Sequence, residues 1–349
     1  MDFEIITKIF AIGKYLALTP AGTTNVSPTL FQKLYVVFVF SVYIAGIVIN
    51  FYSRNSLYLN LPTMQLVLRV LLTADLLAHS YYSIIVVGLF KRHKWIVLIK
   101  NLKSIENKNS TIRWYYLMFV WSHILLLLVT TFIFYAWIKR LGLEFFKIYL
   151  GEYLQMYALF FNTLLCRIVL KMILTRYRYQ STLMSHLVGK KNPQLHILIK
   201  VKNNLVKLRQ TVDSFNDLFG WTILLNVMFV ALRSLIYFDL VLRLNKDEYA
   251  LQIISHAGVM LFNWVETLAV ILLCDTIRKY FEDLLQLFQK LDCNSELVTN
   301  ENEMNALIKC LSRNVPQFTA ARYFNINRSM ILSLLNSITT FLLVMIQFN

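Results

Sequence analysis

The chain has 349 residues, of which 57% are hydrophobic and only 15% are charged, and its mean hydropathy is +0.55. This composition excludes an ordinary soluble globular domain and predicts a membrane protein. Its formal net charge of +16 is explained by basic loops beside anionic lipid, so we do not expect nucleic acid as a partner.

The N-terminal segment, residues 3–16, is the first element in chain order. It is largely apolar but too short to cross a bilayer. We expect it to lie along the inner membrane interface as a helix. The residues expected to face lipid there are Ile6, Ile9 and Phe10.

Seven apolar windows of about 20 residues follow, and each is long enough to span a bilayer. They cover residues 34–52, 64–90, 115–137, 148–170, 218–242, 251–274 and 329–348. The second window is the weakest, because Arg69, Asp75 and His79 lie inside it. No repeat or separate soluble region interrupts the series, so we expect one membrane domain over residues 1–349.

Lysine and arginine positions predict the orientation, because basic loops are retained on the cytoplasmic side. Of the 35 Lys and Arg residues, 26 lie in the N-terminal segment and in the loops after spans two, four and six, and six lie in the other connections. We therefore predict an all-α membrane protein with seven transmembrane helices, a cytoplasmic N-terminus and an extracellular C-terminus. A G-protein-coupled receptor has the opposite orientation.

Two cytoplasmic connections have apolar residues at steps of three and four, which predicts amphipathic helices. The helix before span five has the apolar face Leu198, Val201, Leu205, Leu208, Val212 and Phe215. The helix after span six has the apolar face Ile277, Phe281, Leu284, Leu285, Phe288 and Leu291. Either the rest of the subunit or a neighbouring subunit must cover these faces. A short helix over residues 303–311 is expected next, and the chain re-enters the membrane through residues 318–328.

Catalytic chemistry is not supported by the sequence, which contains no glycine-rich phosphate loop, no His-Glu-x-x-His helix, no Cys-x-x-Cys pair and no nucleophile elbow. We therefore expect no enzyme activity, no catalytic residues, no cofactor and no metal site.

The seventh span carries a polar stripe along one face of its predicted helix. Stepping back from Gln347 by three or four residues gives Val344, and then a run of polar residues: Thr340, Ser337, Asn336, Ser333 and Ser329. An amide in hydrocarbon costs several kcal/mol unless it is paired or hydrated. This pattern is typical of a helix that lines a pore, and the alternative is that Gln347 pairs with a neighbouring helix.

The end of the chain reads Thr340, Phe341, five hydrophobic residues, Gln347 and Phe348. It resembles the C-terminal signature of insect gustatory receptors, with Phe341 in place of the usual tyrosine. The resemblance implies a plasma-membrane, ligand-gated cation channel that needs no G protein. It further implies a homotetramer or a heterotetramer with other gustatory receptors, assembled around an anchor built from the cytoplasmic helical extensions.

In such a tetramer, four copies of Gln347 would form a filter ring and four copies of Val344 an apolar gate, since apolar rings close pores by dewetting. The other pore-lining positions would be Ser333, Asn336, Ser337 and Thr340. The permeant ions would be monovalent cations, with calcium as a further candidate.

A small-molecule tastant is expected to bind between helices in the outer part of the bundle, where aromatic and polar residues gather. The candidate pocket residues are Tyr135, Glu152, Tyr153, Tyr157, Arg233, Tyr237, His256 and Asn263. Each aromatic residue could equally be core or belong to an interfacial belt. Glu152 and Arg233 form either a structural ion pair or a receptor for a polar ligand, and Glu266 presents the same choice deeper in the membrane.

Three rival functions make different predictions. An insect odorant receptor shares the architecture and requires a separate co-receptor. A G-protein-coupled receptor requires an extracellular N-terminus, an Asp-Arg-Tyr triplet after span three and an Asn-Pro-x-x-Tyr motif in span seven, and neither motif is present. A secondary transporter requires inverted repeats. The ending favours the gustatory branch, whose ligands include sugars, bitter compounds, carbon dioxide and internal nutrients.

Overall fold

The computed structural model describes residues 2–20, 27–54, 62–105, 112–188, 195–243, 246–294 and 308–347. Within these ranges, seven helical segments are long and apolar enough to cross a membrane, which confirms the seven predicted spans. They are α2 (Leu30–Ser53), α4 (Thr63–Ser80) continued by η1 (Tyr81–Phe90), α6 (Ile112–Leu141), α7 (Glu144–Val188), α8 (Leu195–Arg243), α9 (Lys246–Asn294) and α11 (Arg328–Gln347).

The second span changes its helical geometry after about two thirds of its length. Its outer part, α4, is α-helical, and its inner part, η1, is a π-helix of ten residues. The π pattern extends to the following residue, where the Lys91 amide donates to the carbonyl of Val86 at 2.9 Å. Helix α5 (Arg92–Ser104) follows on the cytoplasmic side. A π-helix is rare and often marks a functional site.

Helix α7 forms the centre of the bundle. In its most apolar window 83% of the residues are buried, against 17% in α2 and 17% in α11. Helices α2 and α7 cross at two glycines, where a Cβ added to Gly151 would lie 2.6 Å from the backbone of Gly46. Small residues permit such close contact between membrane helices. This crossing brings the end of α2 beside the outer part of α7.

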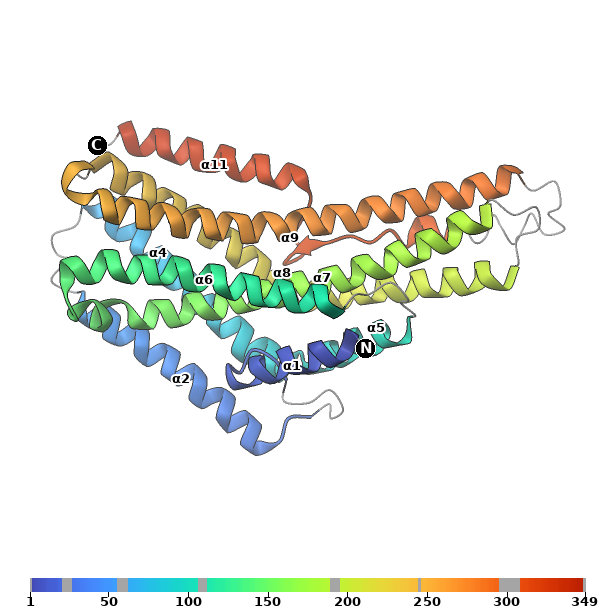
Figure 1. Cartoon of the computed structure of the whole chain (residues 1–349), viewed down its shortest axis with the longest axis horizontal. Coiled ribbons are helices and arrows are strands. Elements are labelled where there is room, and N and C mark those ends of the chain that lie inside the picture. The colour runs from blue at the N-terminus through green and yellow to red at the C-terminus, as the bar shows by residue number, and fades with distance from the viewer. Residues whose placement is uncertain are drawn as a thin grey trace.

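Helices α7, α8 and α9 continue well beyond the other spans on the cytoplasmic side and pack against one another (Figure 1). The predicted apolar faces are buried within one subunit: Leu198, Val201, Leu205, Leu208, Val212 and Phe215 on α8 and Ile277, Phe281, Leu284 and Phe288 on α9 are each at most 2% exposed. The alternative that a neighbouring subunit covers these ten residues is therefore wrong. Of the other two predicted residues, Leu285 is half-buried, and the side chain of Leu291 lies outside the described residues.

The N-terminal segment forms helix α1 (Asp2–Tyr15), but its predicted contact with lipid is wrong for two residues. Ile9 and Phe10 are buried in the protein, at 4% and 8% exposure. The Phe10 ring meets Trp95 of α5 edge-on, with centroids 4.9 Å apart. An apolar helical face has the same sequence pattern whether it meets lipid or protein, and here Trp95 of α5 provides the contact.

The segment before α11 contains a small hairpin that the sequence analysis did not predict. Strand β1 (Thr319–Ala320) pairs antiparallel with β2 (Phe324–Asn325), with Thr319 opposite Asn325 and Ala320 opposite Phe324. Of the short helix expected over residues 303–311, residues 303–307 lie outside the described ranges, and residues 308–313 are helical.

Candidate functional site

Helix α11 lies at the edge of the bundle, along α8 and α9 (Figure 1). Its packing face is made by Leu334, Ile338 and Met345, which are 8%, 5% and 2% exposed. The predicted pore-lining residues lie on the other side of the helix. Ser333, Asn336, Ser337, Thr340 and Gln347 are all exposed, and Val344 is half-buried. Phe341 is 56% exposed, and Phe348 lies outside the described residues.

The hydroxyl groups of this polar face are satisfied within the helix. Ser337 donates to the carbonyl of Ser333 and Thr340 donates to the carbonyl of Asn336, each at 2.9 Å. The two amides differ, because neither Asn336 nor Gln347 makes a side-chain hydrogen bond to another described residue. They are eleven residues apart, so they lie about 20° apart around the helix and roughly 16 Å apart along it. The amides, rather than the hydroxyls, require a polar neighbour.

In the outer part of the bundle, Glu152 of α7 is bound by two arginines. Its two carboxylate oxygens accept from Arg54 at 2.6 Å and from Arg233 at 2.7 Å. This geometry confirms the predicted proximity of Glu152 and Arg233. The contribution of Arg54 was missed, because the sequence places it in an extracellular loop, whereas it is the C-terminal cap of α2 and 6% exposed. The cluster ties α2, α7 and α8 together and carries one more positive than negative charge.

The other candidate pocket residues do not converge on one point. The structure gives the following neighbours: Tyr153 against Phe134 and Phe145, Tyr157 against His123, Tyr237 against Phe238, and His256 against Trp137. Tyr135 is 59% exposed on the outer surface of α6, so its position fits an interfacial belt rather than an interhelical site. Asn263 is buried in α9.

Open space beside the Glu152 cluster is small. One cavity, lined by Arg54, Glu152 and Gln155 among others, has a volume of about 20 Å³. A second outer cavity, between Gln65 and Asp239, is of the same size. Either cavity holds about one water molecule, so a small organic ligand enters these two cavities only if the helices separate.

Glu266 has a partner that the sequence analysis did not name. Its carboxylate forms an ion pair with Arg167 of α7, in the membrane part of the bundle. Glu266 is therefore part of a structural pair between α7 and α9, and both side chains are at most 16% exposed.

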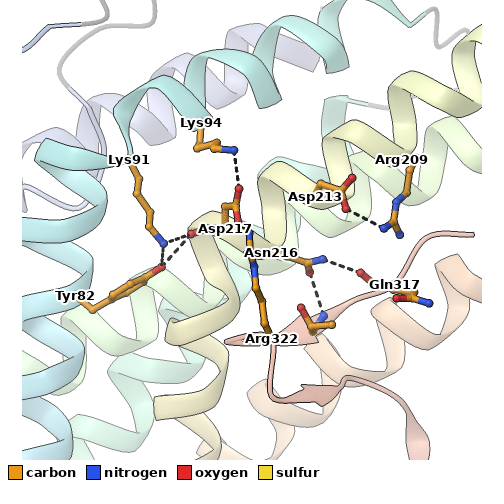
Figure 2. A network of polar contacts seen from close by, with 10 residues as sticks. Tyr82, Lys91, Lys94, Arg209, Asp213, Asn216, Asp217, Gln317 and Arg322 are labelled. Atoms are coloured by element: carbon orange, nitrogen blue, oxygen red, sulfur yellow. Dashed lines mark hydrogen bonds and ion pairs between the residues drawn. The ribbon is translucent and has the colours of Figure 1, made fainter. Parts of the chain in front are cut away.

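A group of polar contacts around Asp217 of α8, called the Asp217 joint below, connects the hairpin before α11 to α5, α8 and the second span (Figure 2). The Asp217 carboxylate binds Lys94 of α5 at 2.7 Å and Arg322 of the hairpin turn at 2.8 Å. The Asp217 carbonyl accepts from Lys91 at 2.6 Å and from the Tyr82 hydroxyl at 3.0 Å. Burial lowers the pKa of the Lys91 ammonium, and the nearby Asp217 carboxylate opposes this shift.

The hairpin is held on α8 by backbone contacts as well. The Asn216 side chain accepts from the amide of Thr319 at 3.1 Å and donates to the carbonyl of Gln317 at 2.7 Å. The hairpin passes so close to α8 that a Cβ on Gly220 would lie 3.0 Å from the amide nitrogen of Ala321. At the first residue of α11, Arg328 binds Asp275 of α9 at 2.6 Å. The entrance of α11 is thus fixed to both α8 and α9.

Comparisons with known proteins agree with this architecture. A family model described as 7tm Chemosensory receptor matches residues 8–349. The structure is similar to that of the insect olfactory receptor OR5 from Machilis hrabei, with a TM-score of 0.71 and 12% sequence identity over 99% of this chain and 98% of that chain. The structure of OR5 in complex with eugenol matches over the full length of both chains, with a TM-score of 0.66 and 14% identity. No curated protein matches the sequence.

Because the family model covers nearly the whole chain, the protein belongs to the seven-transmembrane chemosensory receptor family. It is a multi-pass membrane protein with the fold of the OR5 structures.

Proposed function

We propose that this protein is a gustatory receptor of the plasma membrane and acts as a ligand-gated, non-selective cation channel. In this proposal four subunits, identical or mixed with other gustatory receptors, place their α11 helices around a common pore. The observation that carries the proposal is the exposure of Asn336 and Gln347 on one side of α11, opposite its packing face. Amides on the surface of a membrane helix are stable beside water or protein and costly beside lipid.

Gln347 is the proposed filter residue and Val344 the proposed gate. An exposed glutamine carbonyl can replace part of the hydration shell of a monovalent cation without offering a full negative charge, which favours weak selectivity. Val344, one turn earlier in the helix, would form an apolar constriction next to the filter.

The ligand is proposed to act in the outer part of the bundle, near Glu152. Support comes from the net positive charge of the Glu152 cluster and from its position between three helices. A molecule that separates α2, α7 and α8 there would bind the more open arrangement better, and this difference in affinity shifts the population toward it. The joint at Asp217 and the ion pair of Arg328 would pass the movement of α8 and α9 to α11.

The proposal is tested by expressing the protein alone in cells without native channels and recording currents during application of a ligand panel. Gln347→Ala is expected to change the relative permeability of sodium, potassium and caesium while surface expression stays normal. Thr339→Ala is the matched control, because Thr339 is an exposed polar residue of α11 outside the polar stripe. Unchanged permeation in a normally expressed Gln347→Ala receptor would remove Gln347 from the pore.

An olfactory receptor subunit is the second candidate, because the OR5 structures share the fold over the full chain. Co-expression distinguishes the two functions. A gustatory receptor gives ligand-dependent current alone or together with another gustatory receptor, whereas an olfactory subunit that depends on a co-receptor gives current only when that co-receptor is added.

A further inference from the structure

A cavity of about 340 Å³ lies among α1, α2, η1 and α5. These elements lie across the bundle from α11 (Figure 1), and the cavity shares no lining residue with the Glu152 cluster or with the Asp217 joint. Its volume falls within the range of small-molecule sites in proteins. The cavity lies where α2 begins and η1 ends, which is the cytoplasmic boundary of the membrane-spanning part.

The charged residues that line this cavity are all cationic. Among the residues that the structure describes, Lys14 of α1 and Arg92 of α5 take part in the lining, and no aspartate or glutamate does. Arg92 is only 3% exposed, and one of its guanidinium nitrogens donates to the side-chain oxygen of Gln32 at 2.7 Å, which fixes the group beside the cavity. Lys14 is exposed and forms no ion pair with any described residue. Two positive charges without a lining carboxylate favour an anion.

The rim of the cavity is apolar and open. Tyr15 and Phe31 line it and are 75% and 78% exposed. On α2, the neighbouring Leu30 and Leu34 are 74% and 60% exposed. Apolar side chains at this depth face lipid acyl chains in a protein that spans a membrane, so the opening lies toward the inner leaflet. The site combines a cationic interior with an apolar entrance.

We propose that this cavity binds the headgroup of one anionic phospholipid of the inner leaflet. The phosphate lies between Lys14 and Arg92, and the acyl chains leave the cavity past Phe31 and run along α2. A zwitterionic lipid carries the same phosphate, but its ammonium group would meet two cations and no carboxylate. The cavity therefore selects lipids with net negative charge, and basic groups near the inner leaflet are known to attract such lipids.

The position of Lys14 depends on the turn that ends α1. Ala17 adopts a left-handed conformation (φ 57°), and the Thr19 hydroxyl donates to the carbonyl of Phe10 at 2.8 Å. Gly13 is required there, since a Cβ would lie 2.6 Å from the Thr19 side chain. A bound lipid would thus join α1, α2 and α5, which are distant in sequence.

The test uses native mass spectrometry of the purified full-length receptor in detergent, with phosphatidylinositol, phosphatidylcholine or inorganic phosphate added separately. The wild-type protein is expected to bind phosphatidylinositol more tightly than phosphatidylcholine. Lys14→Gln should weaken the first phosphatidylinositol adduct by about fivefold, the value for one basic group near an anionic lipid. Lys8→Gln is the matched control, because Lys8 is exposed on the same helix and does not line the cavity.

Because Lys14 is exposed, its replacement leaves the packing of α1 intact, and an unchanged gel-filtration profile verifies this. Equal binding of the two lipids, or a Lys14→Gln protein that binds phosphatidylinositol like the wild type, would overturn the proposal. Phosphate adducts that depend on Lys14 without any preference for phosphatidylinositol would indicate a site for free anions and would equally reject a lipid site.

Discussion

Val344 lies within the polar stripe of α11, between Thr340 and Ser337 around the helix, and it is half-buried. If it forms the closed gate, a hydroxyl in its place should let water wet the constriction. We predict that Val344→Ser raises the ligand-free current several-fold, measured by whole-cell recording without ligand.

Ile346→Ser provides the comparison for Val344, because Ile346 is 54% exposed and lies about 160° from Val344 around α11. It introduces the same hydroxyl two residues away and should leave the basal current at the wild-type level. A Val344→Ser receptor that reaches the cell surface with wild-type basal current would locate the gate elsewhere.

Glu152 neutralises part of the charge of two arginines in a largely buried setting, with side chains of 7%, 12% and 14% exposure. Glu152→Gln leaves both guanidinium groups without this counter-ion. Removing one partner of a buried ion pair costs about 3–5 kcal/mol. We therefore predict a clear loss of thermal stability for the detergent-purified protein, measured as the temperature at which half of the material is lost from the monodisperse gel-filtration peak.

Glu282→Gln is the control for this effect. Glu282 forms an exposed pair with Arg278, four residues earlier on α9, and such pairs contribute about 0.3–0.5 kcal/mol. Equal thermal stability of the Glu152 and Glu282 variants would mean that the outer cluster contributes no more than a surface ion pair.

Among the elements, the hairpin before α11 has an unusual turn. Ala321 and Arg322 both have positive φ values, of 51° and 66°, and the Tyr323 amide donates to the carbonyl of Ala320 at 3.0 Å. Turns of this kind favour asparagine and glycine, and each non-glycine residue in this region costs about 1 kcal/mol or more. The contacts of Asn216 and Asp217 with the hairpin offset this cost and hold it on α8.

The joint therefore offers a test of how α11 is connected to the bundle. Asp217→Asn keeps the size of the side chain and removes the charge that binds Lys94 and Arg322. We predict that the ligand concentration for half-maximal current changes by about tenfold, because couplings between sites are typically 1–3 kcal/mol. Dose–response recordings measure this shift.

Asp213→Asn is the matched control for Asp217. Asp213 lies one turn earlier on α8, is 53% exposed and pairs with Arg209 on the same helix. Its replacement should leave the dose–response curve unchanged. An unshifted curve for Asp217→Asn at normal surface expression would separate the joint from gating.

At the scale of the whole molecule, the sequence predicted the features that depend on a local pattern of residues. Apolar windows located all seven spans, and periodicity located the cytoplasmic extensions of α8 and α9. What it missed depends on contacts between distant residues. Arg54 reaches Glu152 across 98 positions, and the hairpin depends on a glycine and two polar side chains of α8. No short window of sequence contains such information.

The candidate site likewise has one part that the sequence predicted, the stripe on α11, and one part that it could not predict, the proposed ligand region. The stripe on α11 follows from a helical period alone, and its polar residues from Ser333 to Gln347 are exposed on one side of the helix, with Val344 half-buried among them. The proposed ligand region required knowledge of which helices meet. Seven of the eight residues suggested for it divide between an ion cluster, aromatic contacts and the outer surface, and the eighth, Asn263, is buried in α9. The π-helix in the second span has no signature in its composition.

The ion pair between Arg167 and Glu266 has a consequence for biosynthesis. The two residues are 99 positions apart, so Arg167 reaches the translocon long before its partner has been synthesised. An isolated arginine in a membrane segment costs roughly 2.5–3.5 kcal/mol at insertion. The ion pair can form only after the ribosome has made α9, so until then the insertion machinery or the earlier spans must accommodate the unpaired charge of Arg167.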